Sequence, residues 1–137
     1  MSETQPEDHI PFLRFLGVRE LPAPPGQARM QLPELKPEHC NLLPAAHGGV
    51  VMTLLDVAMA RAALAAPTAS AAAVVTVEMS SRFLQPGRGP LTATGRVLHG
   101  GRSLCTCQAD VAQADGTVVA TAMGTFKYWK GTTGGVE

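Results

Sequence analysis

The chain has 137 residues, of which 45% are hydrophobic and 16% charged, and this composition fits one globular domain with a buried core and a sparsely charged surface. Eleven basic and eleven acidic residues give a formal net charge of zero, which argues against a nucleic-acid-binding protein because such a protein needs a basic face. No stretch approaches the about 20 uninterrupted apolar residues of a membrane span, and the polar, acidic start lacks the pattern of a signal peptide, so we expect a cytoplasmic protein.

The first third of the chain gives weak signals for regular structure. Residues 7–17 predict a short amphipathic helix that ends at Gly17. Residues 18–23 and 26–32 predict two modest strands, separated by a proline-rich turn. Residues 36–45 contain two prolines and predict an irregular segment that leads into the next helix.

A long helix is predicted from about His47 to Ala66, and Pro67 ends it. Apolar residues cover nearly its whole circumference: Val50, Val51, Leu54, Leu55, Val57, Ala58 and Met59. A helix that is apolar all round must be buried on most sides.

The second half of the chain predicts strands. Residues 74–83 alternate in character, so that one face would carry Val75, Val77, Met79 and Phe83 and the other Thr76, Glu78, Ser80 and Arg82. Further strands at 91–99, 103–112 and 117–129 are joined by tight turns, which predicts antiparallel neighbours. Together with the buried helix they indicate a single α+β domain in which a sheet curls around the helix. Residues 131–137 predict a disordered tail.

The three cysteines, Cys40, Cys105 and Cys107, are an odd number without a framework spacing, which suggests reduced thiols. Cys105 and Cys107 lie two residues apart on one face of a predicted strand, and core packing is the simplest interpretation. A metal site that adds His39 or His99 is the alternative, although the spacing does not match a structural zinc site.

The start of the long helix carries two glycines, Gly48 and Gly49, each of which costs a helix on the order of 1 kcal/mol relative to alanine. Backbone N–H groups are free at a helix start, and glycine lets a ligand approach them closely. These two properties are what an oxyanion hole requires. A loop that merely turns the chain into the helix is the alternative.

Asp56 is a carboxylate on an otherwise apolar helix, with no cation well placed on the same helix. A buried, unpaired carboxylate is costly, so Asp56 needs a role, a distant partner or solvent access. An ion pair with a distant arginine such as Arg82 is the structural alternative to a catalytic role.

Gly48 and Asp56 are eight residues apart, which on one helix separates them by about 12 Å and about 80°. The two residues of one chain therefore cannot act on the same carbonyl carbon. If both are catalytic, Gly48 of one chain must meet Asp56 of another, which predicts a homo-oligomer with active sites at subunit interfaces.

The run from Asn41 to Ala62, N…HGGVVMTLLDVAMARA, resembles the hotdog-fold thioesterases of the phenylacetyl-CoA (PaaI-like) type, which carry an Asn, a His-Gly-Gly and a helical Asp at this spacing. The resemblance continues through VTVEMSSRFLQPG, GRVLHGGRSLCTCQADV and GTVVATAMGTFKY, over roughly residues 10–128. It implies an antiparallel sheet wrapped around a central helix, dimers that usually pair into tetramers, and hydrolysis of acyl-CoA thioesters without a metal or organic cofactor.

The resemblance also implies roles for individual residues. Asp56 would be the catalytic general base or nucleophile, and Gly48 would supply the oxyanion N–H. His47 and Asn41 would orient the thioester and the water, although a histidine before a helix is often only structural. Thr76 matches a hydroxyl position that assists water in some members.

The HGGRS loop resembles the segment of the family that contacts the nucleotide of CoA. The residues that the resemblance implies for binding substrate or CoA are Gly49, Arg82, Arg88, Gly101, Arg102 and Ser103.

Two other functions stay open. A hotdog hydratase or dehydratase would move a proton on the acyl chain, but the glycine-rich HGG lacks the proline-bearing loop of those enzymes. A non-catalytic acyl-CoA sensor would bind the thioester without turnover. The sequence does not distinguish an aryl from a medium-chain aliphatic acyl group.

Overall fold

The computed structural model describes residues 10–67 and 69–130. The predicted tail at 131–137 lies outside these residues. The elements in chain order are α1 (Pro11–Leu16), β1 (Arg19–Leu21), β2 (Gln27–Leu32), the 3-10 turn η1 (Pro37–His39), α2 (Gly48–Leu64), β3 (Ala73–Phe83), β4 (Leu91–Gly100), β5 (Leu104–Gln113) and β6 (Val118–Trp129). Every predicted helix and strand is confirmed to within a few residues.

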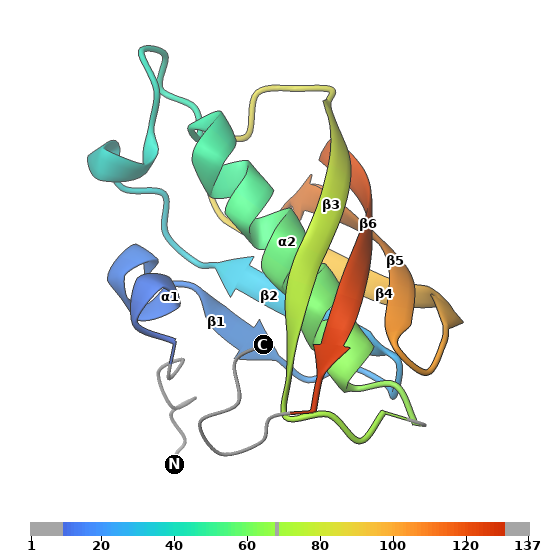
Figure 1. Ribbon diagram of the computed structural model, residues 1–137. Helices are drawn as coiled ribbons and strands as arrows, with labels where there is room; N and C mark the ends of the chain where they lie inside the picture. The colour runs from blue at the N-terminus through green and yellow to red at the C-terminus, as the bar shows by residue number, and fades with distance from the viewer. Residues whose placement is uncertain (1–9, 68, 131–137) are drawn as a thin grey trace.

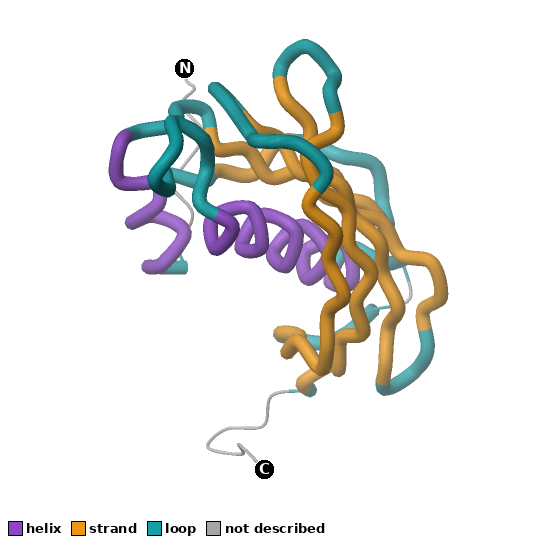
Figure 2. Tube along the Cα trace, turned by 90° about the horizontal axis from the view of Figure 1, so that it is seen from above, coloured by secondary structure: helices purple, strands orange, loops and turns teal. Residues whose placement is uncertain are grey.

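The strands form one antiparallel sheet in the order β1-β2-β4-β5-β6-β3. The sheet curves around α2, which lies along its concave face (Figures 1 and 2). This arrangement confirms the predicted α+β fold. Strand β3 pairs only with β6, so within the described residues one edge of this eleven-residue strand is left without a neighbour.

Helix α2 is the centre of the core, with nine of its 17 residues buried. Of the other eight, Gly49, Met52, Thr53, Asp56 and Ala60 form a narrow stripe along the helix that is at least partly exposed, and Gly48, Arg61 and Leu64 lie near its two ends. The helix is therefore apolar on most sides, as predicted, and its only carboxylate, Asp56, lies on the stripe that stays partly exposed.

A glycine in β4 allows α2 to lie directly against the sheet. A Cβ atom at Gly95 would be 2.9 Å from the Met59 nitrogen and closer still to the carbonyl of Ala58. Both are backbone atoms in the middle of α2, so no side-chain rotation could make room. The helix backbone and the sheet backbone are thus in contact at this point.

The face predicted for the middle of β3 was partly wrong, because a β-bulge lies between Thr76 and Glu78. The bulge adds Val77 to the strand and reverses the alternation on one side of it. Thr76 pairs with the buried Phe126 and faces the helix, whereas Val75 is exposed. Thr76 therefore shares the helix side with Met79 rather than lying opposite to it.

None of the helices in the described part of the chain has the length and hydrophobicity that a membrane crossing requires.

Replacing Gly95 with alanine is expected to destabilise the protein by about 1–3 kcal/mol or more, because the added methyl group must push α2 away from the sheet. Urea denaturation monitored by circular dichroism measures the change. Gly100→Ala is the matched control on the same strand, since its nearest new neighbour would be Val97 Cγ1 at 3.8 Å. Equal stability of the two variants would contradict the backbone contact.

Candidate active site

The first turn of α2 is capped by His47. Its Nδ1 accepts a hydrogen bond from the Gly49 amide at 2.9 Å, so the neutral ring carries its proton on Nε2. This bond uses the Gly49 N–H and leaves the Gly48 N–H without a hydrogen bond among the described residues. The structural role considered for His47 is thus present. Because the cap places the ring proton on Nε2, the Nε2–H of His47 is available to donate a hydrogen bond to a ligand.

His39 fixes the segment that precedes this cap, and at 4% exposure it is the one buried polar side chain among the described residues. Its Nε2 donates to the Leu16 carbonyl at 2.8 Å, and its Nδ1 accepts from the Lys36 amide at 2.9 Å. Its own carbonyl accepts from the His47 amide at 2.7 Å. One residue therefore joins the end of α1, the turn η1 and the start of α2, a role that the sequence analysis missed.

The side chain of Asn41 is held in place by a hydrogen bond within the loop that follows it. Its Oδ1 accepts from the Leu43 amide at 2.9 Å, which leaves its NH₂ group available as a donor. Asn41 and Gly48 line the same cavity, of about 390 Å³, together with Phe83, Gln85 and Gly87. The structure thus brings these two predicted site residues together.

Asp56 lies two turns further along α2. Its Oδ1 accepts a 2.6 Å hydrogen bond from the Thr76 hydroxyl, a length typical of a hydroxyl bound to a charged carboxylate. The bulge at Val77 makes this contact possible, because it turns Thr76 toward the helix. The alternative ion pair with Arg82 is wrong: Arg82 pairs with Thr121 on the outer side of the strand and is exposed.

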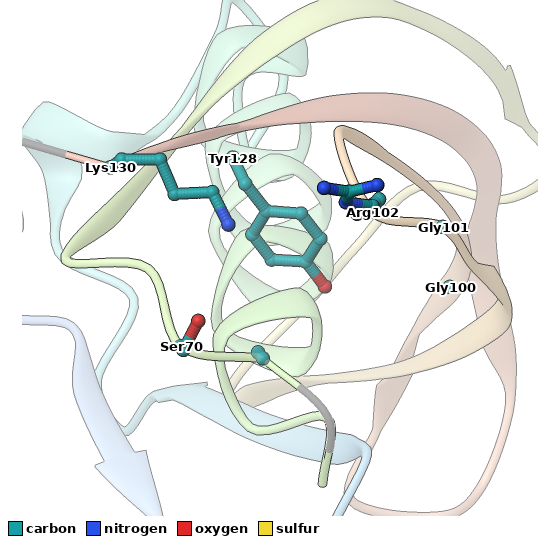
Figure 3. A pocket seen from close by; sticks show the side chains of 7 residues that line it. Ser70, Gly100, Gly101, Arg102, Tyr128 and Lys130 are labelled. Carbon is teal, nitrogen blue, oxygen red and sulfur yellow. The ribbon is translucent and has the colours of Figure 1, made fainter.

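Basic residues gather at the far end of α2. Two adjoining cavities of about 470 and 560 Å³ share Arg102, Tyr128 and Lys130. Gly101 lines one of them, and Ser103 and Lys127 line the other. Figure 3 shows the Tyr128 ring between the side chains of Arg102 and Lys130.

The structure sorts the predicted CoA-binding residues into two groups. Gly101, Arg102 and Ser103 lie in the basic cavities with Lys127 and Lys130, two lysines that the sequence analysis did not assign. The sequence did hold a signal for these two lysines: they lie on either side of Tyr128, at the end of the last predicted strand. Arg88 lies elsewhere and donates to the Pro44 carbonyl at 3.2 Å, and Gly49 remains at the start of α2.

Cys105 and Cys107 belong to the core, which confirms the simpler interpretation. Both are fully buried, with 3.7 Å between their sulfur atoms. The ring nitrogens of His39 are both bound to the backbone, and no group of three potential metal ligands occurs among the described residues. Burial, together with the neighbouring Cys105, raises the pKa of the Cys107 thiol to about 12.

The structure thus combines an antiparallel sheet curled around one helix with an unused Gly48 amide at the helix start and a carboxylate, Asp56, on the exposed stripe of the helix. The sequence profile of the Thioesterase superfamily matches residues 43–120, more than half of the chain. The chain therefore belongs to the thioesterase superfamily, and it is similar to a PaaI protein of the hotdog fold, as the resemblance predicted.

Individual relatives agree with this assignment. A Halobacterium salinarum protein, provisionally named an esterase, is 33% identical over 133 residues, which cover 90% of this chain and 87% of its own. The Escherichia coli PaaI protein, from the phenylacetic acid degradation operon, is 25% identical with a TM-score of 0.81 over 90% of this chain and 88% of its own. A thioesterase family protein from Silicibacter pomeroyi is 30% identical with a TM-score of 0.81 over 88% and 90%.

Thiol labelling of the native protein at pH 8 is expected to modify Cys40, which is partly exposed, and to spare Cys105 and Cys107. Because the pKa of Cys107 is raised from 9.0 to about 12, its contribution to stability is complete below pH 9. It is lost as the pH rises toward 12, because only the unfolded thiol ionises in that range. Mass spectrometry after labelling, with and without denaturant, measures the modified sites, and native labelling of Cys107 would contradict this burial.

Proposed function

We propose that the protein hydrolyses acyl-CoA thioesters to a free acid and CoA, with Asp56 as the catalytic carboxylate and the Gly48 N–H as oxyanion donor. The observation that carries this proposal is the exposed stripe of α2. This stripe presents a carboxylate, Asp56, that accepts a hydrogen bond from Thr76, and the Gly48 amide at the start of the same helix is unused. The rest of the helix is mostly buried. No metal or organic cofactor is needed for this chemistry.

The reaction needs only a few groups. Asp56 accepts a proton from water while the water oxygen bonds to the thioester carbonyl carbon, or the carboxylate attacks this carbon itself. The Gly48 N–H, supported by the Nε2–H of His47 and the NH₂ of Asn41, stabilises the negative charge on the carbonyl oxygen. Collapse of the tetrahedral intermediate breaks the C–S bond and releases CoA thiolate, which takes up the proton that Asp56 accepted from water. After attack by the carboxylate, collapse leaves a mixed anhydride; water then hydrolyses it, which regenerates Asp56, releases the acid and supplies the proton for the thiolate.

The two parts of this site come from different subunits, since Gly48 and Asp56 of one chain are too far apart to share a carbonyl carbon. The free edge of β3 offers the way to join them. It carries exposed Val75 and Val77, and an apolar strand edge of this length is a template for pairing with a second strand.

An antiparallel pair of β3 strands has a two-fold axis near the strand centre, at Glu78. The Phe83 end of one strand then meets the Ala73 end of its partner. Phe83 packs beside Gly48, its ring 3.7 Å from a Cβ built on that glycine, and Thr76 lies three residues from Ala73. Pairing thus carries the Gly48 of one chain toward the Asp56 of the other, in a dimer or in a tetramer made of two such dimers.

The basic cavities suit the phosphates of CoA. Tyr128, which lines them, lies two residues beyond Phe126, the register partner of Thr76, so they are near the Asp56 half of the shared site. Arg102, Lys127 and Lys130 supply the cations and Gly101 and Ser103 the adjoining loop. Arg82 and Arg88 lie outside these cavities.

Asp56→Asn is expected to lower kcat by a factor of about 100 or more, because it keeps the shape of the side chain and removes its charge. Thiol release from aryl and aliphatic acyl-CoAs measures the rate. Asp110→Asn, a carboxylate on β5 with similar partial exposure, is the matched control and should retain activity. Wild-type protein that binds acyl-CoA without releasing thiol would overturn the proposal and support a sensor, and hydroxyacyl-CoA products would support a hydratase.

Sharing between subunits is tested by mixing two inactive variants. Gly48→Pro removes the oxyanion N–H at the first helical position, where proline is favoured, and the extended backbone of His47 suits a following proline. Subunits carrying Gly48→Pro and Asp56→Asn, refolded together, should regain about a quarter of wild-type activity, since half of the dimers are mixed and each mixed dimer has one intact site. If the site lay within one chain, the mixture would stay inactive.

A further inference from the structure

His39 is buried in the segment before α2, and each of its polar atoms takes part in a hydrogen bond. Its amide donates to the Lys36 carbonyl at 2.9 Å, and its carbonyl accepts from the His47 amide at 2.7 Å. Its ring accepts from the Lys36 amide at Nδ1 and donates to the Leu16 carbonyl at Nε2. The backbone therefore occupies both ring nitrogens, and the side chain has no free atom with which to bind a substrate or transfer a proton.

We propose that His39 is nevertheless a positioning residue for the reaction, because it sets the direction of the Gly48 N–H through the backbone of His47. This inference rests on the proposed function, in which the Gly48 N–H is the oxyanion donor. It adds which atoms hold this donor, and it separates the two bonds of the His39 ring. The bond to Lys36 serves the site, and the bond to Leu16 serves the attachment of α1.

The peptide between His47 and Gly48 determines where the Gly48 N–H points. In a trans peptide such as this one, the N–H and the preceding carbonyl point in opposite directions within one plane. The His47 carbonyl accepts from the Val50 and Val51 amides at 2.9 and 3.1 Å, so it points into α2. The Gly48 N–H therefore points out of the helix start, where the carbonyl oxygen of a thioester would bind.

His39 holds the other side of His47. The His47 amide is bound to the His39 carbonyl and the His47 carbonyl is bound within α2, so this residue is anchored at both ends. Without the bond to His39, the amide end would be free. The peptide plane that carries the Gly48 N–H could then turn about the backbone angles of His47, and the donor would be correctly aimed for only part of the time.

The direction of the His39 carbonyl depends in turn on the His39 ring. Two hydrogen bonds join Lys36 and His39, one between their backbones and one from the Lys36 amide to Nδ1, and together they close the turn η1. The bond from Nε2 reaches Leu16, 23 residues away, and attaches α1 instead. The acceptor at Nδ1 is therefore the part of the ring on which the His39 carbonyl depends.

Two amide side chains can each reproduce one of the two ring bonds. Asparagine places an oxygen near the position of Nδ1, so His39→Asn keeps an acceptor for the Lys36 amide and loses the donor to Leu16. Glutamine places an NH₂ group near the position of Nε2, so His39→Gln keeps the donor and loses the acceptor. Each variant gives up one buried bond, so the two should lose similar stability and differ in which bond remains.

The experiment measures kcat and KM for acyl-CoA hydrolysis by wild type, His39→Asn, His39→Gln and His99→Gln, together with the Tm and oligomeric state of each. His39→Gln should lower kcat about tenfold or more and change KM by less than about twofold, because a misdirected donor weakens binding of the transition state. His39→Asn should stay within about threefold of the wild-type kcat. His99 is exposed on β4, and its variant, the control, should match wild type. Equal losses of kcat in the two His39 variants, or a loss expressed in KM, would overturn the inference.

The Gly48→Pro variant separates positioning from a general effect on stability. It already lacks the N–H, so adding His39→Gln should lower the remaining kcat by less than about twofold if His39 acts through this donor. A second loss of about tenfold in the double variant would show that His39 affects activity by another route, and the inference would fail.

Amide hydrogen exchange gives a reading that does not depend on turnover. The His47 amide should exchange at least about tenfold faster in His39→Gln than in wild type, and at close to the wild-type rate in His39→Asn. Unchanged exchange in His39→Gln would contradict the inference even in a wild type that hydrolyses thioesters. If wild type releases no thiol and the His47 amide responds as expected, the hydrolase proposal fails and the role of His39 in holding the helix start stands.

Discussion

The contact between the backbone of α2 and the sheet at Gly95 determines how the rest of the molecule is arranged. Because no side chain separates the two elements there, any residue larger than glycine at this position would push the helix away from the sheet and change how it lies on it. Its orientation therefore decides which residues remain uncovered. The uncovered stripe contains Gly49 and Asp56. The packing of α2 in the core therefore determines which polar groups are exposed.

The start of α2 is equally constrained, but by hydrogen bonds rather than by packing. The carbonyl of His39 holds the His47 amide, and the ring of His47 in turn caps Gly49. This chain of bonds gives each histidine one tautomer and leaves the Gly48 amide open. Two glycines, a poor choice for a helix on propensity, are stabilised by a cap and by the burial of the turns that follow.

The sequence was sufficient to predict the helices and strands and to single out the unusual residues on α2. Hydrophobic periodicity and local propensity carry the information for both. It failed where one residue changes a register or where a contact is long-range. The alternation along β3 placed Thr76 away from the helix, since the bulge at Val77 leaves no local signal. Likewise, His39 contacts a carbonyl 23 residues away, and Lys130 meets Arg102 only when β6 closes beside the β4–β5 turn.

The arrangement resolves the apparent conflict of a buried helix that begins with two glycines and carries an aspartate. In the proposed shared site, one subunit supplies the rigid hydrogen-bond donors, and the other supplies the carboxylate and the cations. Each half is fixed by its own fold: Asp56 by Thr76 on the edge strand, and Gly48 by the capped helix start. In this proposal the edge strand that positions the carboxylate is also the surface that pairs with the second subunit, so assembly and catalysis would both depend on a single element, β3.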